Sequence, residues 1–218
     1  MTDTLRTDPP HDPGLPQRLA GRLRRALPGA AAQSRYQPQA SYGRHFGPAP
    51  ASARPAAVLV LLYPAEGAWH LPLTLRPAFL ADHAGQVSLP GGAVEPNEPS
   101  ELAAVRELNE ELGVDAQSIE LLGELSPVYL FRSNFLITPW LAVCRSRPDW
   151  QPNPAEVAEL VELPLAVLLD PESTAVEVWQ DQGIAFQVTA LRHQGHVIWG
   201  ATAMILAELA ALAVESPG

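Results

Sequence analysis

The sequence contains a single cysteine, Cys144, among 218 residues. One thiol cannot form an internal disulfide framework, and it cannot build a zinc cluster whose ligands are mainly thiolates. This scarcity of cysteine fits a reducing, intracellular setting. Because no obvious base lies beside it in the sequence, we interpret Cys144 as a small buried strand residue and not as a nucleophile.

Lysine is absent altogether. All 14 basic residues are arginine, they face 24 acidic residues, and the formal net charge is −10. Binding of nucleic acid requires a basic surface that neutralises phosphates, so an acidic chain is a poor candidate for that role. A small phosphorylated substrate remains compatible, because metal ions can bridge protein carboxylates and substrate phosphates.

Long apolar runs are also missing. No segment has the length of apolar sequence that a transmembrane helix needs, and residues 1–16, with three aspartates and four prolines, lack the apolar core of a secretory signal. We therefore expect a cytoplasmic protein with no membrane partner. The hydrophobic content of 47% is sufficient for a buried core, and either a monomer or a homodimer is compatible with this composition.

We expect the chain to divide at residue 54. Residues 1–54 are predicted to be an N-terminal extension, with a disordered start, a helix over 15–26 and a Pro- and Ala-rich connection on the surface. Residues 55–218 are predicted to form one domain of the α+β class, in which helices sandwich a mixed β-sheet (α/β/α). The apolar and alternating segments predict strands over 57–63, 68–76, 85–89, 119–125, 135–145, 157–164, 175–180 and 184–191, and helices over 100–112 and 200–214.

The helix over 100–112 carries an acidic face. On a helical wheel Glu107, Glu110 and Glu111 lie together, opposite an apolar side that is expected to hold Leu102, Val105, Leu108 and Leu112, and Gly113 is placed to end the helix. One interpretation is an ordinary amphipathic helix with a solvated acidic face. Three neighbouring carboxylates repel one another, however, unless a cation lies among them. Hard oxygen ligands of this kind suit Mg²⁺ or Mn²⁺.

The residues around this helix extend the pattern. The run is Gly92, five residues, Glu98, seven residues, and then Arg106-Glu107-Leu108-Asn109-Glu110-Glu111-Leu112-Gly113-Val114. It resembles the Nudix box at every defined position and with the same spacing. The resemblance implies the Nudix fold and metal-dependent hydrolysis of a diphosphate.

The resemblance also implies roles for individual residues. Glu107, Glu110 and Glu111 correspond to metal-binding carboxylates, and Gly92 to a position whose backbone carbonyl approaches the metal. Arg106 corresponds to an arginine that orients a catalytic glutamate by ion pairing.

Two further roles follow from the same resemblance. Glu98 corresponds to a glutamate that braces the loop against the helix and supports the site without chemistry of its own. The general base varies among family members, so Glu107 or Glu110 can serve, and Glu156 and Glu159 are downstream candidates. For these last two, a solvent-exposed position near a strand start is the favoured interpretation.

The segment before the box resembles the coenzyme A pyrophosphatase signature, which runs leucine–threonine–x–arginine and then leucine–x–x–histidine–x–glycine–glutamine–valine. The residues that carry it are Leu73-Thr74-Leu75-Arg76, Leu80, His83 and Gly85-Gln86-Val87. Pro77 and Leu89 depart from the usual pattern. The resemblance implies coenzyme A or its derivatives as substrate, with 4′-phosphopantetheine species and adenosine 3′,5′-bisphosphate as products. Arg76 suits a phosphate because guanidinium pairs with it bidentately, whereas His83 and Gln86 either contact substrate or hold the loop.

Other functions stay open at this point. The protein can be a Nudix hydrolase of another nucleoside diphosphate derivative, such as ADP-ribose or a dinucleotide, although one cysteine excludes a four-cysteine zinc site. It can also be a non-catalytic domain that senses a nucleotide, a function that the complete glutamate set disfavours. A decapping role is disfavoured by charge. Trp199 is interpreted as core packing at a helix start, in preference to a stacking platform for adenine.

Overall fold

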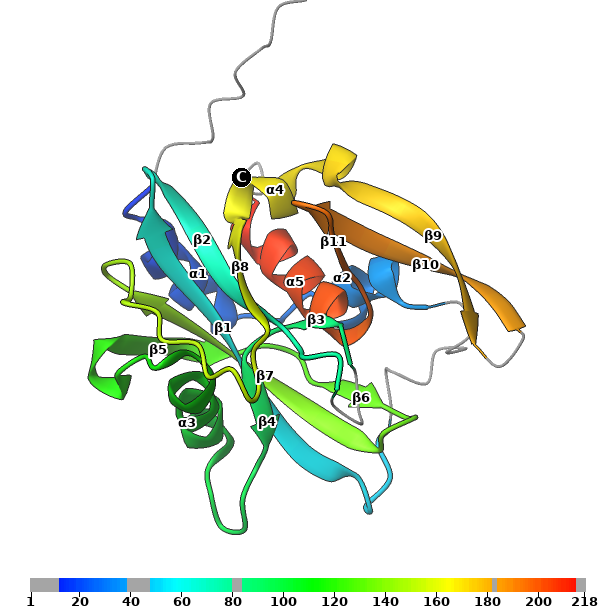
Figure 1. Cartoon of the computed structure of the whole chain (residues 1–218). Helices are drawn as coiled ribbons and strands as arrows, with labels where there is room; N and C mark the ends of the chain where they lie inside the picture. Colours follow the sequence, from blue (N-terminus) through cyan, green and yellow to red (C-terminus); the bar gives the residue numbers. More distant parts are fainter. Residues whose placement is uncertain (1–11, 39–47, 80–83, 182–183, 215–218) are drawn as a thin grey trace, which may run out of the picture.

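A mixed β-sheet forms the centre of the molecule, and helices cover both of its faces (Figure 1). In this computed structural model the described residues are 12–38, 48–79, 84–181 and 184–214. The α+β class and the three-layer arrangement predicted from the sequence are confirmed.

The sheet is organised around β1 (Arg54–Ala65). This strand pairs in parallel with β7 (Phe135–Cys144) and antiparallel with β2 (Ala68–Leu75) and β4 (Gly91–Ala93). The remaining strands of the sheet are β3 (Val87–Ser88), β5 (Ile119–Glu124), β6 (Val128–Leu130) and β8 (Glu159–Pro164). The main strand order is β3-β2-β1-β7-β5, and β8 pairs with β2. One parallel pair among antiparallel ones makes the sheet mixed, as predicted.

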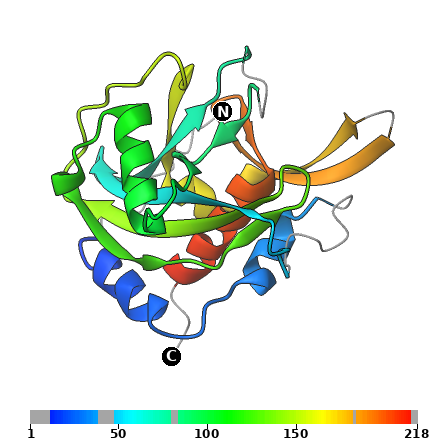
Figure 2. The same ribbon diagram turned by 90° about the horizontal axis from the view of Figure 1, so that it is seen from below.

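Two apolar layers cover the sheet, and β1 serves both. Successive strand residues point to opposite faces, so Leu59 and Leu61 pack in the core beneath α3 (Ser100–Leu112), whereas Val60 and Leu62 pack in the core beneath α5 (Gly200–Ala213). This double burial explains the continuous apolar run in the sequence. Figure 2 shows α3 on one side of the sheet, with α5 and α1 (Leu15–Leu23) on the other.

A second, smaller sheet projects from the body of the molecule (Figure 1). It consists of β9 (Thr174–Asp181), β10 (Ile184–His193) and β11 (His196–Ile198), all antiparallel. The short helices of the structure are α2 (Ala30–Gln33), α4 (Leu165–Leu169), η1 (Ser34–Tyr36), η4 (Ala116–Ser118) and η5 (Pro171–Ser173). None of the helices in the described ranges is both long enough and apolar enough to cross a membrane.

The N-terminal segment contributes to the core, which the sequence did not predict. Helix α1 ends at Leu23 instead of residue 26, and the connection that was expected on the surface contains α2, η1 and the buried side chain of Tyr36. The reason is the fully buried carboxylate of Glu208 in α5, which accepts hydrogen bonds from the backbone N–H of Gly29 and the side-chain amide of Gln33. The division of the chain at residue 54 stays a prediction.

The orientation of α3 also differs from the helical-wheel prediction. The buried face runs through Ala103, Ala104 and Leu108 and includes Glu111, while Leu102 is 55% exposed. Side-chain hydrophobicity alone had placed Leu102 on the buried face. The two alanines instead face the sheet, where their small side chains fit a close helix–sheet contact, and this rotation carries part of the acidic face inward.

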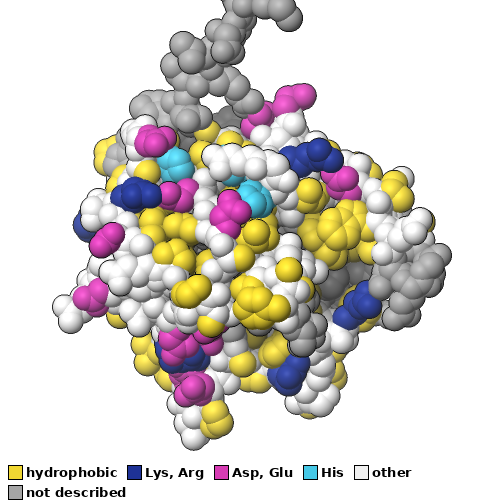
Figure 3. Space-filling model, viewed as in Figure 1, with side chains coloured by type: hydrophobic (Ala, Val, Ile, Leu, Met, Phe, Trp, Pro, Cys, Tyr) yellow, Lys and Arg dark blue, Asp and Glu magenta, His cyan; other side chains and the backbone are white. Residues whose placement is uncertain are grey.

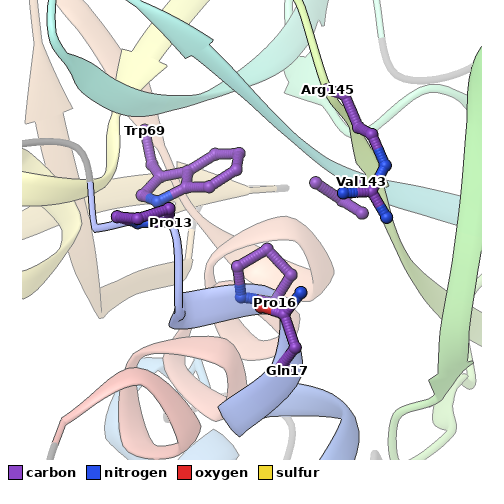
Figure 4. Close-up of a pocket in the computed structure, with 6 residues that line it drawn as sticks. All are labelled: Pro13, Pro16, Gln17, Trp69, Val143 and Arg145. Atoms are coloured by element: carbon purple, nitrogen blue, oxygen red, sulfur yellow. The ribbon is translucent and has the colours of Figure 1, made fainter.

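A small cavity of about 100 Å³ lies where the N-terminal segment crosses the sheet (Figure 4). It is lined by Pro13, Pro16, Gln17, Trp69, Val143 and Arg145. The Trp69 indole N–H donates to the carbonyl oxygen of Asp12, which fixes the segment against β2. Trp69 pairs with Pro64 near one end of β1, whereas Gly92 pairs with Ala57 towards the other end, so this cavity is remote from the acidic helix face.

Candidate active site

Three carboxylates converge at the buried side of α3. Glu107 and Glu111 come from the helix and Glu156 from the loop before β8, and each offers an oxygen within 4.8 Å of the others. A concentration of hard oxygen donors at this spacing can hold a divalent cation such as Mg²⁺. Acidic side chains also gather beside basic ones on the surface over α3 (Figure 3).

Glu111 is the most unusual member of this group, because it is only 2% exposed. Its Oε2 has no hydrogen-bond partner among the residues that the structure describes. Burial, followed by repulsion from Glu107, raises the pKa of Glu111 to about 8, while Arg76 and a hydrogen bond from the backbone of Gly91 act in the opposite direction. A buried, unpartnered carboxylate oxygen is costly unless a cation or proton accompanies it. The residues therefore fit a metal ion at this position.

The backbone at Gly92 leaves no room for a side chain. β4 runs antiparallel to β1, with Gly92 opposite Ala57, and this pairing directs the Gly92 α-carbon towards α3. A Cβ atom at Gly92 would lie 2.4 Å from Oε1 of Glu107 and 2.5 Å from its Cδ. A larger residue at this position would displace the Glu107 carboxylate or the loop.

Arg106 ties the loop to the helix. Its Nε donates to Oε1 of Glu98 at 2.8 Å and its Nη2 to Oε2 of Glu98 at 3.0 Å, while Nη2 also reaches the carbonyl oxygen of Ala93. The bidentate pair with Arg106, supported by the Glu95 backbone N–H, lowers the pKa of Glu98 to about 2. Glu98 therefore lies where a bracing role predicts it.

The same arginine contacts two box glutamates. Arg106 Nη1 donates to Glu107 Oε1 at 2.9 Å and to Glu110 Oε2 at 3.1 Å. The pKa of Glu107 is nevertheless raised, because burial outweighs the attraction of Arg106. Glu110 is about half exposed at its side chain and lies outside the group of three, next to Glu107. Gly113 ends α3 as predicted, with a left-handed backbone (φ 71°) and its N–H bonded to Asn109.

Asn153 brings Glu156 to the site. The Asn153 backbone N–H donates to the carbonyl oxygen of Glu111, and its side-chain amide donates to Oε1 of Glu156 at 3.2 Å. Its own carbonyl accepts from the N–H groups of Glu156 and Val157, which closes a turn just before the strand predicted over 157–164, and β8 itself begins at Glu159. Glu156 is thus half-buried and not solvent-exposed as expected. The turn-forming Asn153 was the signal that sequence reasoning missed.

Glu159 lies apart from the carboxylates. Its side chain is 53% exposed and pairs with Nε2 of His196 at 3.2 Å. The favoured interpretation, an exposed position near a strand start, is confirmed for Glu159.

The residues before the box lie beside the same site. The backbone N–H of Arg76 donates to the carbonyl oxygen of Gln86, and the backbone N–H of Gly85 donates to the carbonyl oxygen of Arg76. These two bonds join the ends of the loop between Arg76 and Gly85. Nε of Arg76 is buried with no hydrogen-bond partner in the described ranges, and its charge acts on Glu111. His83 lies outside the described residues.

Comparison with known proteins assigns this architecture to a family. Nudix hydrolases named NudL, described as uncharacterized, are 38% identical over 139 residues in Photorhabdus laumondii (63% of this chain, 74% of that protein) and 37% identical over 161 residues in Salmonella paratyphi B (72% and 81%). A solved Nudix hydrolase of M. smegmatis, RenU, is 28% identical, covers 52% of this chain and 71% of its own, and has a TM-score of 0.45. The NUDIX domain model matches residues 53–182, which is more than half of the chain. The chain therefore belongs to the Nudix family.

Proposed function

We propose that this protein is a divalent-metal-dependent pyrophosphohydrolase that cleaves the diphosphate of coenzyme A or its derivatives, giving 4′-phosphopantetheine species and adenosine 3′,5′-bisphosphate. The observation that carries the proposal is the group of Glu107, Glu111 and Glu156, with one buried oxygen that lacks a partner among the described residues. Nudix enzymes generally use divalent metals, and this acidic group is compatible with one.

The residues that would hold Mg²⁺ or Mn²⁺ are Glu107, Glu111 and Glu156, with Glu110 and the backbone carbonyl of Gly92 as further ligands. When bound, such a cation neutralises charge on a diphosphate and acidifies a water. Repulsion between Glu107 and Glu111, which now raises the pKa of Glu111, would become attraction to a shared cation.

The chain itself supplies positioning and a base. Arg106 holds Glu107 and Glu110 through one Nη1 atom, so we assign it the orientation of these carboxylates. Glu156, a third candidate for the general base, accepts a hydrogen bond from the Asn153 side-chain amide at its Oε1. We assign the general base to one of Glu107, Glu110 and Glu156, and we give Glu159 no part in the chemistry.

Support for a phosphate-bearing substrate comes from Arg76. Its buried Nε has no partner in the described part of the chain, and guanidinium groups pair bidentately with phosphate oxygens. The coenzyme A assignment rests on the signature around Arg76 and Gln86. Within it, His83 stays a predicted contact. A cytoplasmic location and a monomeric or homodimeric state also stay predictions.

A substrate panel tests the proposal. Purified protein with Mg²⁺ or Mn²⁺ is given coenzyme A, acetyl-coenzyme A, oxidised coenzyme A, ADP-ribose and a dinucleoside polyphosphate, and the products are identified by mass spectrometry. We expect the highest kcat/KM for a coenzyme A compound, with adenosine 3′,5′-bisphosphate released. If ADP-ribose or the dinucleotide is turned over faster, that compound replaces coenzyme A as the assigned substrate. Binding without metal-dependent turnover by the wild type would favour a nucleotide-sensing domain.

A further inference from the structure

An open pocket lined by two indole rings lies between the small sheet and the segment before the box. Its volume is about 320 Å³, within the roughly 300–1,000 Å³ typical of small-molecule pockets. The rings of Trp179 and Trp199 lie with their centroids 4.6 Å apart and their planes tilted by 40°. Its other walls include Leu75, Gln86, Val87 and His196.

This pocket lies next to the segment that carries Arg76 in the candidate active site. Leu75 and Gln86 both line it. Leu75 precedes Arg76 in the chain, and the carbonyl oxygen of Gln86 accepts a hydrogen bond from the backbone N–H of Arg76. Val87 also lines the pocket and lies four positions before Gly91, so at most about 14 Å of extended chain joins the two residues. The Gly91 backbone also bonds to Glu111, so the pocket wall lies within the length of one nucleotide of the carboxylates.

A second connection runs through the strand that follows the Glu156 loop. Leu75 pairs with Glu159 across β2 and β8, and its carbonyl oxygen accepts from the N–H of Ala158. Glu159 in turn holds the ring of His196 at the pocket wall. The wall thus combines flat aromatic rings with a polar group in a fixed position.

We propose that this pocket binds the nucleobase of the diphosphate substrate, with the Trp179–Trp199 pair as its stacking surface. The inference rests on the proposed function and names a subsite for it. Indole faces stack on nucleobases, and Gln86 and His196 supply polar groups of the kind that contact base edges. A long apolar chain is the rival occupant. It needs no hydrogen-bonding groups, and so it does not account for His196 being fixed by Glu159 at the wall. Trp199 then has a binding role in addition to the packing that the sequence suggested.

The test compares substrates with and without a base. KM is measured for ADP-ribose and for the matched base-free ester, ribose 5-diphosphate linked to a second ribose, with the wild type, Trp179→Phe and Trp179→Leu. Val178→Ala is the matched control, because Val178 is the next residue on β9 and is 69% exposed. We expect Trp179→Leu to remove at least about fivefold of the KM preference for the base-bearing ester, from the usual strength of base–aromatic stacking. Trp179→Phe retains most of that preference, and Val178→Ala retains all of it.

A binding experiment separates this inference from the proposed function. Adenosine 5′-monophosphate and ribose 5-phosphate are titrated by calorimetry in chelator, where no turnover occurs. Tighter binding of the adenosine compound by the wild type, lost in Trp179→Leu, supports the pocket even if no diphosphate is hydrolysed, a result that would overturn the proposed function alone. If wild type and Trp179→Leu show the same ratio of affinities for adenosine 5′-monophosphate and ribose 5-phosphate, the pocket assignment is overturned. So does a Trp179→Leu effect on KM that depends on acyl-chain length and not on the base.

Discussion

The α-carbon of Gly92 faces the carboxylate of Glu107 so closely that a Cβ atom there would lie 2.4 Å from Oε1. The two residues belong to different elements, β4 and α3, and Glu107 is one of the three converging carboxylates. The loop backbone at Gly92 and the carboxylates of α3 thus form one continuous surface at the candidate metal site.

Replacing Gly92 with alanine should disrupt that surface. The new methyl group forces Glu107 or the loop to move, and displacements of about 1 Å near reacting groups cost on the order of 100-fold in rate. We expect Gly92→Ala to lower kcat by that order while the protein stays folded by circular dichroism. Gly21→Ala is the control, because nothing lies within 4 Å of the added atom in α1 and activity should be unchanged. A fully active Gly92→Ala protein would contradict the placement of Glu107 in the site.

Glu111→Gln should separate stability from activity. The pKa of Glu111 is raised from its ordinary value of 4.5 to about 8, so the folded state binds its proton more tightly than the unfolded state does. Its stabilising contribution is complete below pH 4.5 and is lost as pH rises through about 8. We therefore compare the free energy of unfolding of the two proteins by urea titration in chelator. The variant should be more stable than the wild type, and the difference should grow as the pH rises from 4.5 to about 8. Metal-dependent activity should fall by at least about 100-fold from loss of charge at the site. A variant that is destabilised at pH 8, or one that turns over normally, would contradict this account.

Arg106→Lys tests the orientation of the carboxylates. Lysine cannot reproduce the bidentate pair with Glu98 together with the contacts to Glu107 and Glu110. We expect kcat to fall by roughly 10- to 100-fold, as for other groups that orient metal ligands, with faster amide exchange over residues 93–98. Arg145→Lys is the control, since that side chain is 76% exposed and pairs only with Glu120 in the contacts described.

Glu156→Gln and Glu159→Gln form a matched pair. Glu156 lies in the group of three carboxylates, whereas Glu159 pairs with His196 outside it. We expect Glu156→Gln to weaken Mn²⁺ binding by about 10-fold or more, measured by calorimetry, and Glu159→Gln to leave it unchanged. Asn153→Ala should give a smaller decrease, because it frees Glu156 without removing it. Equal metal affinity in all three variants would exclude Glu156 from the metal site.

Glu208→Gln tests the attachment of the N-terminal segment. The Glu208 carboxylate is fully buried and accepts hydrogen bonds from Gly29, Gln33 and both the N–H and the hydroxyl of Ser126. An amide replaces one acceptor oxygen with a donor, so buried donors lose their partner at about 2 kcal/mol or more. The urea midpoint should fall while kcat of the folded protein stays near normal. Glu172→Gln, exposed in η5, is the control and should leave the midpoint in place.

Much of the fold follows from local sequence pattern. Predicted strands and helices coincide with the observed ones to within a few residues, and the helix over 100–112 has the predicted bounds, because apolar periodicity and Gly113 are local signals. The hydrophobic pattern was a poorer guide to which side chains of a helix are buried when small residues form the contact. Leu102 was assigned to the core by its hydrophobicity, yet Ala103 and Ala104 face the sheet. The three-residue strands β4, β6 and β11 are too short to show an alternating pattern, and β4 also depends on pairing with the distant β1.

By itself, the sequence determined the Nudix family and the candidate carboxylates, because residue type and spacing along one loop and one helix carry that information. Tertiary structure alone decided which of these carboxylates meet. Glu111 is buried, Glu110 stays outside the group and Glu156 joins it from a separate loop, since each position depends on how α3 and the Asn153 turn pack against the sheet. The contact between Trp179 and Trp199 was decided in the same way. Burial and the proximity of distant segments are properties of packing, and no local pattern specifies them.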